Sequence, residues 1–93
     1  METLRWTVLI HNIPPKPAYF RIKVANRLSG LGAVALKNSV YLLPDSAEAR
    51  ESFIWLAQEV EAGGGKAFVG EATFFGARVA EGIKEMFMAA REQ

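Results

Sequence analysis

Two apolar runs on either side of a short turn constrain this chain more than any other feature of its sequence. The stretch LGAVALKNSVYLLP, Leu31–Pro44, predicts a β-hairpin with strands at Ala33–Leu36 and Val40–Leu43 around a Lys37-Asn38-Ser39 turn. Alternate residues of a strand point to opposite faces of its sheet, so a hairpin with one face in water is polar at every second position. Here both faces are apolar, and the fold must cover both.

The alternation sorts the hairpin side chains into two sets. One face carries Val34, Leu36, Val40 and Leu42, and the other carries Ala33, Ala35, Tyr41 and Leu43. Asn38 is the residue expected to take the left-handed position of the turn, because its short polar side chain tolerates that conformation.

The segments around the hairpin have their own periodicities. β-branched and aromatic residues predict a first strand over residues 4–10. Helical spacing predicts a helix over 18–31, which Gly32 closes in a left-handed conformation. After the hairpin, Asp45 or Ser46 caps a second helix that three consecutive glycines terminate. A strand over 66–73 and a helix over 77–91 complete the chain.

This order of elements is the split β-α-β arrangement of ferredoxin-like folds. We predict one α+β domain over residues 1–93, in which a ferredoxin-like βαββαβ sandwich over 1–75 places its first and third strands side by side at the centre. An additional C-terminal helix follows over 76–93. Two helices cover one face of such a sheet, so the other face requires either the third helix or the sheet of a second subunit.

The third helix carries an apolar stripe of its own. Its members are Val79, Ile83, Met86, Phe87 and Ala90. One helix covers only part of a four-stranded sheet, and large exposed apolar patches are unusual on soluble monomers. We therefore expect a homodimer built through the open sheet face and this helix. The residues predicted at its interface are Tyr41, Leu43, Ile83 and Phe87.

The charge of the chain is unevenly distributed. The net charge is only +1, but residues 1–44 carry six basic residues against one acidic residue, and residues 45–93 carry five against nine. Such asymmetry is typical of a surface that binds a polyanion. An uneven but ordinary solvated surface is the alternative interpretation.

The basic residues concentrate on the first predicted helix. Lys16, Lys23 and Arg27 follow one another at spacings of seven and four, on the side away from the apolar stripe, and Arg21 flanks them. These four residues are the candidate site for duplex DNA or for a small oxyanion. A solvated helix face without a ligand is the alternative.

No catalytic set can be assembled from the remaining polar residues. Cysteine is absent, His11 is the only histidine, and no carboxylate lies near it in the sequence. The acidic residues Asp45, Glu48 and Glu51 are explained by their position at a helix start. We therefore predict no enzyme activity, no metal and no cofactor. No stretch approaches the ~20 apolar residues of a membrane span, and the start lacks the features of a secretory signal.

Several segments resemble the amino-terminal domain of ChrB-type chromate-resistance regulators. In chain order they are Trp6–Ile10, Ile13-Pro14, Lys16-Pro17, Arg21, Arg27-Leu28, Leu31–Ala33, Val40–Pro44, Trp55–Glu59 and Gly64–Ala67. The resemblance implies a cytoplasmic bacterial module that takes part in transcription regulation, DNA binding and the response to chromate. Full-length members continue into a second domain. The family's first helix is richer in basic residues, and only Arg27 of that run is kept here.

A more distant resemblance is to the small ferredoxin-like CRISPR-associated nucleases. Those proteins end the first strand with an aspartate that binds a metal, and the corresponding segment here is His11-Asn12-Ile13-Pro14. Because the neutral Asn12 cannot replace a carboxylate as a ligand for a hard divalent cation, we expect no nuclease activity.

Overall fold

The structure is a computed structural model that describes residues 5–14 and 18–91. Its elements, in chain order, are β1 (Trp6–Asn12), α1 (Ala18–Gly30), β2 (Val34–Lys37), β3 (Val40–Pro44), α2 (Ala47–Ala62), β4 (Lys66–Ala72) and α3 (Ala77–Arg91). The four strands form one antiparallel sheet in the order β2-β3-β1-β4. The first and third strands are therefore neighbours at the centre, which confirms the predicted ferredoxin-like α+β fold.

The hairpin turn differs from the prediction in one residue. Ser39, not Asn38, has the positive φ, at 76°. An irregularity between Ala35 and Lys37 extends β2 to Lys37, which pairs with Val40 and leaves only Asn38 and Ser39 in the turn. The carbonyl of Ser39 accepts a hydrogen bond from the backbone N–H of His11 at 2.9 Å, so the turn is tied to the end of β1.

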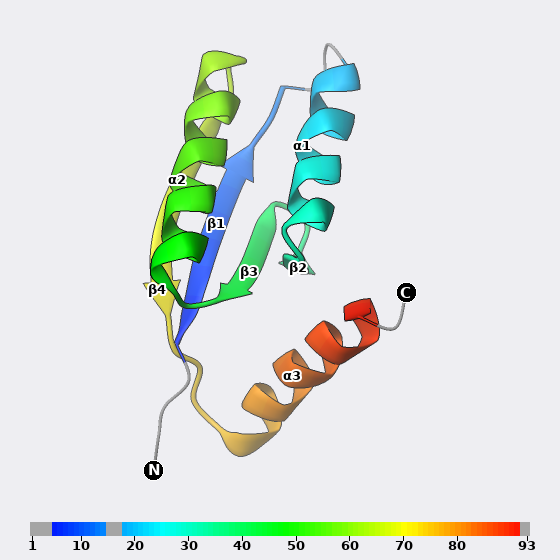
Figure 1. Ribbon diagram of the computed structural model, residues 1–93, viewed down its shortest axis with the longest axis vertical. Coiled ribbons are helices and arrows are strands. Elements are labelled where there is room, and N and C mark those ends of the chain that lie inside the picture. The colour runs from blue at the N-terminus through cyan, green and yellow to red at the C-terminus, as the bar shows by residue number, and fades with distance from the viewer. Residues whose placement is uncertain (1–4, 15–17, 92–93) are drawn as a thin grey trace.

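Helices α1 and α2 lie side by side over one face of the sheet (Figure 1). The core between helices and sheet consists of Leu9, Val24, Leu28, Leu43, Ala49, Phe53, Leu56, Ala57 and Val60, all of them buried. Every residue of α2 in this set belongs to one helical stripe. The helical layer thus depends on a single apolar face from each helix.

The other face of the sheet is covered by α3 at one end only (Figure 1). Trp6, Leu42 and Ile83 form a second buried cluster there, with Val8, Phe74 and Phe87 packed against it. The rings of Trp6 and Phe87 stack with their centroids 5.1 Å apart. Helix α3 therefore folds back on its own sheet, and one chain covers part of both faces of the hairpin.

The structure places two residues of the predicted dimer interface on the helical side. Leu43 is buried in the core beneath α1 and α2, and Tyr41 packs against the same core. Ile83 and Phe87 lie on the opposite face. The two sets cannot form one surface of this chain, because residues of odd number in β3 point toward the helices and Leu42 points toward α3.

Part of the second face stays uncovered. Ile10 pairs with Val40 on one side and with Phe68 on the other, so these three side chains share a face. Ile10 is 45% exposed and Phe68 is 67% exposed. Leu9 points into the core beneath α1 and α2, so its neighbour Ile10 points to the opposite face of the sheet. This is the same face that α3 covers around Trp6 and Leu42. Ile10, Val40 and Phe68 are called the uncovered sheet patch below.

A network of polar side chains lies at one end of the sheet. The hydroxyl of the buried Thr7 donates to Oδ1 of Asp45 at 2.9 Å, and Arg50 donates to both Asp45 oxygens at 2.9 and 2.7 Å. These bonds, those from Arg50 above all, lower the pKa of Asp45 to about 2. Nη2 of Arg50 also lies 3.3 Å from Glu71 on β4. The network therefore joins β1, β4 and the start of α2.

The sequence left open whether Asp45 or Ser46 caps α2, and the structure identifies the capping residue. Ser46 is the N-cap residue, since its hydroxyl accepts a hydrogen bond from the backbone N–H of Ala49 at 2.9 Å. Asp45 is engaged by Thr7 and Arg50 instead.

None of the described helices has the length and apolar character needed to cross a membrane.

The helical core generates a prediction about stability. Phe53 is completely buried, so Phe53→Ala should lower the free energy of unfolding by about 3–5 kcal/mol through lost burial and the cavity left behind. The neighbouring Ile54 is 48% exposed, and Ile54→Ala serves as the matched control, with an expected change within about 0.5 kcal/mol. Urea titration followed by circular dichroism measures both. Equal losses would show that α2 does not pack as described.

Candidate functional site

The two helices on the sheet carry opposite charge. Helix α1 carries Arg21, Lys23 and Arg27 and no acidic residue, whereas α2 carries four glutamates and one arginine. The two helices lie side by side (Figure 1), so the helical layer has one positive and one negative half. Helix α1 is the element to which a negatively charged ligand is attracted.

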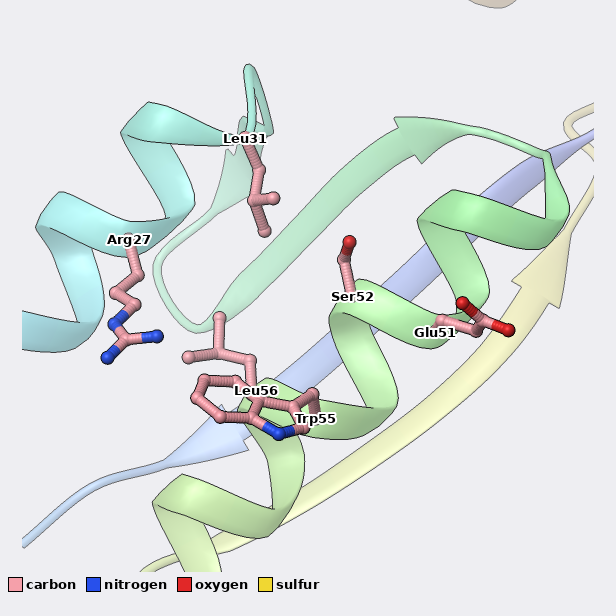
Figure 2. A pocket seen from close by; sticks show the side chains of 6 residues that line it. All are labelled: Arg27, Leu31, Glu51, Ser52, Trp55 and Leu56. Atoms are coloured by element: carbon pink, nitrogen blue, oxygen red, sulfur yellow. The ribbon is translucent and has the colours of Figure 1, made fainter.

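Arg27 lies at the edge of the outer face of α1, and its guanidinium reaches toward α2. Its Nη1 lies 3.2 Å from Oε1 of Glu59, and its guanidinium lies 5.0 Å from the centre of the Trp55 ring. Figure 2 shows Arg27 reaching from α1 toward Trp55 on α2. The carboxylate offsets much of the positive charge of Arg27, so this residue adds less to the potential of α1 than the sequence suggests.

A groove between the two helices surrounds this pair. It has a volume of about 370 Å³ and is lined by Arg27, Leu31, Glu51, Ser52, Trp55 and Leu56 (Figure 2). In the structure Trp55 is 54% exposed and lies beneath the Arg27 guanidinium. The spacing of Trp55 and Glu59 places both on one side of α2. Their pairing with Arg27 depends on how the two helices are aligned.

The remaining basic residues of α1 point in different directions. Lys23 lies on the outer face, where it lines a shallow depression with Tyr19, Ile22, Asn26 and Arg27. Arg21 lines a separate cavity near the hairpin turn. The reason is helical geometry, since residues two positions apart lie about 200° apart around the axis. Lys16 lies outside the described residues. Of the predicted site, the structure thus brings together Lys23 and Arg27.

The outer face of α1 also exposes apolar side chains. Tyr19 is 71% exposed and Ile22 is 61% exposed, and both lie beside Lys23 in the depression. Sequence analysis singled out only the cations on this face. The sequence could have indicated that Tyr19 and Ile22 are exposed, because neither belongs to the stripe formed by the buried residues Val24 and Leu28.

His11 lies at the end of β1, next to the cavity that contains Arg21. Its ring stacks on that of Tyr41, with centroids 5.4 Å apart. Both imidazole nitrogens are shielded from solvent and have no hydrogen-bond partner among the described residues. Burial lowers the pKa of His11 below its usual 6.5, and the charge of Arg21 lowers it further. His11 is therefore a neutral, unpartnered imidazole at neutral pH.

Within residues 5–14 and 18–91, no group of three or more His, Asp or Glu side chains comes together that could hold a metal ion. The absence of enzyme activity stays a prediction that rests on the lack of a catalytic set in the sequence, and the absence of nuclease activity stays one that rests on the neutral Asn12.

Comparison with known proteins gives one match. The family model described as "Protein ChrB, N-terminal" matches residues 21–93, more than three quarters of the chain. The match runs from Arg21 in α1 through α3 and confirms the resemblance noted in the sequence. No curated protein and no solved structure shows a significant match.

The environment of His11 generates a prediction about pH. His11 is the only histidine, so its ring protons give one titrating set of NMR signals. The fitted pKa should lie below 6.5 because burial disfavours the imidazolium. The folded state then binds this proton less well than the unfolded state, so stability should fall as the pH drops below 6.5 and level off beneath the folded pKa.

The control for this titration is Arg21→Gln. Removing the nearby charge should raise the pKa of His11 but leave it below 6.5, since burial is the larger cause. A value at or above 6.5 in the unaltered protein would contradict the described burial.

Proposed function

Because the chain belongs to the family of ChrB N-terminal domains, we propose that it is a non-catalytic regulatory module of chromate resistance that contacts duplex DNA through the outer face of α1. The observation that carries the DNA contact is the charge of α1, which has three basic residues, no acidic residue and an exposed outer face. Transcription regulation in response to chromate is the role that the family resemblance implies.

The chemistry of the outer face suits a phosphate backbone. Lys23 supplies a mobile charge, and Tyr19, Ile22 and Asn26 beside it supply contact area and hydrogen-bonding groups. Phosphate contacts make up most of the affinity of such proteins for DNA and make it dependent on salt. With Arg27 partly neutralised by Glu59, the binding of one domain should be weak and strongly reduced by salt.

An oxyanion is the alternative ligand of the same cations. Chromate and sulfate carry two negative charges on one tetrahedral frame, so either would compete with a phosphate of DNA for Lys23. Competition by sulfate at constant ionic strength separates an oxyanion site from simple screening, because screening depends only on ionic strength.

Fluorescence anisotropy with a labelled duplex tests the DNA contact. The affinity should fall steeply between about 50 and 200 mM salt. Lys23→Ala should weaken binding and reduce the salt slope by about 1, and Arg27→Ala should weaken it less. Lys84→Ala, on α3 across the sheet, is the control for loss of a positive charge.

Glu59→Gln provides the converse test. It removes the carboxylate that pairs with Arg27, so it should tighten DNA binding. Glu61→Gln makes the same change of charge at a residue that has no ion pair within the described part of the chain. An affinity unaffected by Lys23→Ala, or equal gains from both glutamine variants, would remove the outer face of α1 as the DNA contact.

The competing function is an interaction module that only dimerises. The uncovered sheet patch favours it, because Ile10 and Phe68 are exposed and apolar on a face that α3 covers at one end only. A two-fold pair that joins these patches would bury them against their own copies and present two α1 helices on one assembly. A homodimer can also contact DNA, so dimerisation alone does not distinguish the two proposed functions. A dimer that does not bind DNA would favour the interaction module.

Light scattering at micromolar concentration tests the dimer. The expected mass is twice the 10.2 kDa of the chain. Phe68→Glu should give a folded monomer, because it places a charge on the uncovered sheet patch. Phe87→Glu is a poorer probe, since Phe87 stacks on Trp6 within one chain. Tyr19→Glu, on the opposite side of the molecule, is the control. A monomer in the unaltered protein would exclude this interface.

A further inference from the structure

A second cavity opens where the end of β1 meets the β2–β3 turn and α1. Its volume is about 380 Å³, which lies within the range of small-molecule sites. The polar side chains that line it are His11, Arg21, Asn38, Ser39 and Tyr41. The apolar ones are Ile13, Ile22, Val24 and Ala25. A ligand that fills this space therefore needs an apolar body as well as a polar group.

The charge of the cavity limits the polar group. Arg21 is the only charged side chain among the described residues that line it, and His11 is neutral because its pKa lies below 6.5. One guanidinium balances one negative charge, whereas a dianion would bring a second charge into the cavity without a partner. The planar donor fork of arginine also matches the two oxygens of a carboxylate.

His11 supplies an unused hydrogen-bonding group. Neither ring nitrogen has a hydrogen-bond partner among residues 5–14 and 18–91, and a buried polar group without one is costly. The ring lines the cavity, so a turn about its Cβ–Cγ bond would bring a nitrogen to a ligand there at the cost of its stacking on Tyr41. Unpartnered buried groups in native proteins call for an explanation, and a missing ligand is one.

The turn beside His11 fixes another part of the cavity lining. Ser39 holds a φ of 76°, a conformation that two-residue hairpin turns favour, and its carbonyl accepts a hydrogen bond from the backbone N–H of His11. Here the turn places the polar side chains of Asn38 and Ser39 at the wall of the cavity.

We propose that this cavity binds a small organic monocarboxylate, with its carboxylate on Arg21 and its apolar body against the wall of Ile22 and Val24. The proposal goes beyond the DNA contact, since Arg21 lies in a different depression from Lys23. His11 stays neutral at pH 7 beside the bound carboxylate, although the added negative charge raises its pKa.

NMR titration of the ¹⁵N-labelled chain tests the site, with benzoate as the probe. At constant ionic strength, benzoate should give saturable shifts at the amides of Asn38 and Ser39 and should raise the pKa of His11. Benzamide, which has the same shape without the charge, should bind at least tenfold more weakly, and sulfate should give no saturable shift at these amides.

Two variants of α1 make the test specific. Arg21→Gln should weaken benzoate binding at least tenfold, and its exposed position leaves the fold intact. Lys23→Gln should change it less than twofold, although it impairs the proposed DNA contact. Equal binding of benzamide, equal shifts with sulfate, or full benzoate affinity in Arg21→Gln would each overturn the monocarboxylate site and leave the DNA proposal untouched.

Discussion

The burial of β3 from both sides is the constraint on which the rest of the structure depends. Leu42 and Leu43 are neighbours in the sequence, and both are buried, although they point to opposite faces of the sheet. A strand of this kind is stable only as an inner strand of a layered fold, since an edge or a one-sided sheet would leave one of the two leucines in water. The pairing of β3 with both β1 and β2 satisfies this requirement.

The two layers that bury β3 cover different fractions of the sheet. This difference determines where the charged surface and the apolar surface of the molecule lie. On one side, α1 and α2 cover the sheet with stripes that are fully buried, so their outer faces are free to carry charge. On the other side, α3 covers only the end of the sheet around Trp6, Leu42 and Ile83. The positive surface and the apolar surface of the molecule are therefore separated by the thickness of the sheet.

The elements and their order could be predicted from the sequence because their signals are local. The periodicity of α2 identifies its buried stripe, whereas that of α3 identifies Ile83 and Phe87 but not Val79, which is 46% exposed. A left-handed φ of 79° at Gly32 follows from its position after a helix. The face of Tyr41 and Leu43 could not be predicted, because alternation separates two sets of residues without saying which set meets the helices. The left-handed Ser39 depends on a bulge in β2 that the sequence pattern does not show.

From the sequence, the candidate site could be predicted only as a group of basic residues on one helix, without their contacts. Spacing alone grouped Lys23 and Arg27 correctly, but the pair between Arg27 and Glu59 arises from two helices whose relative alignment only the folded core fixes. The same holds for the cavity at His11, which takes its walls from β1, the hairpin turn and α1. Each contact joins segments distant in sequence, and no local period encodes such contacts.

The position of Arg21 has a consequence for the two proposed ligands of α1. Arg21 and Lys23 lie on one rigid helix, so a carboxylate bound at Arg21 reduces the positive charge of the same element that attracts phosphate. Arg21 and Lys23 are two residues apart, which is about 3 Å along the helix axis. This separation is shorter than the ~8–10 Å over which charges interact at physiological salt. Linkage then requires that bound DNA lower the affinity for the carboxylate by the same factor by which the bound carboxylate lowers the affinity for DNA. A regulatory module in which one helix carries both contacts would need no change of fold to respond to its ligand, because the coupling acts through charge alone.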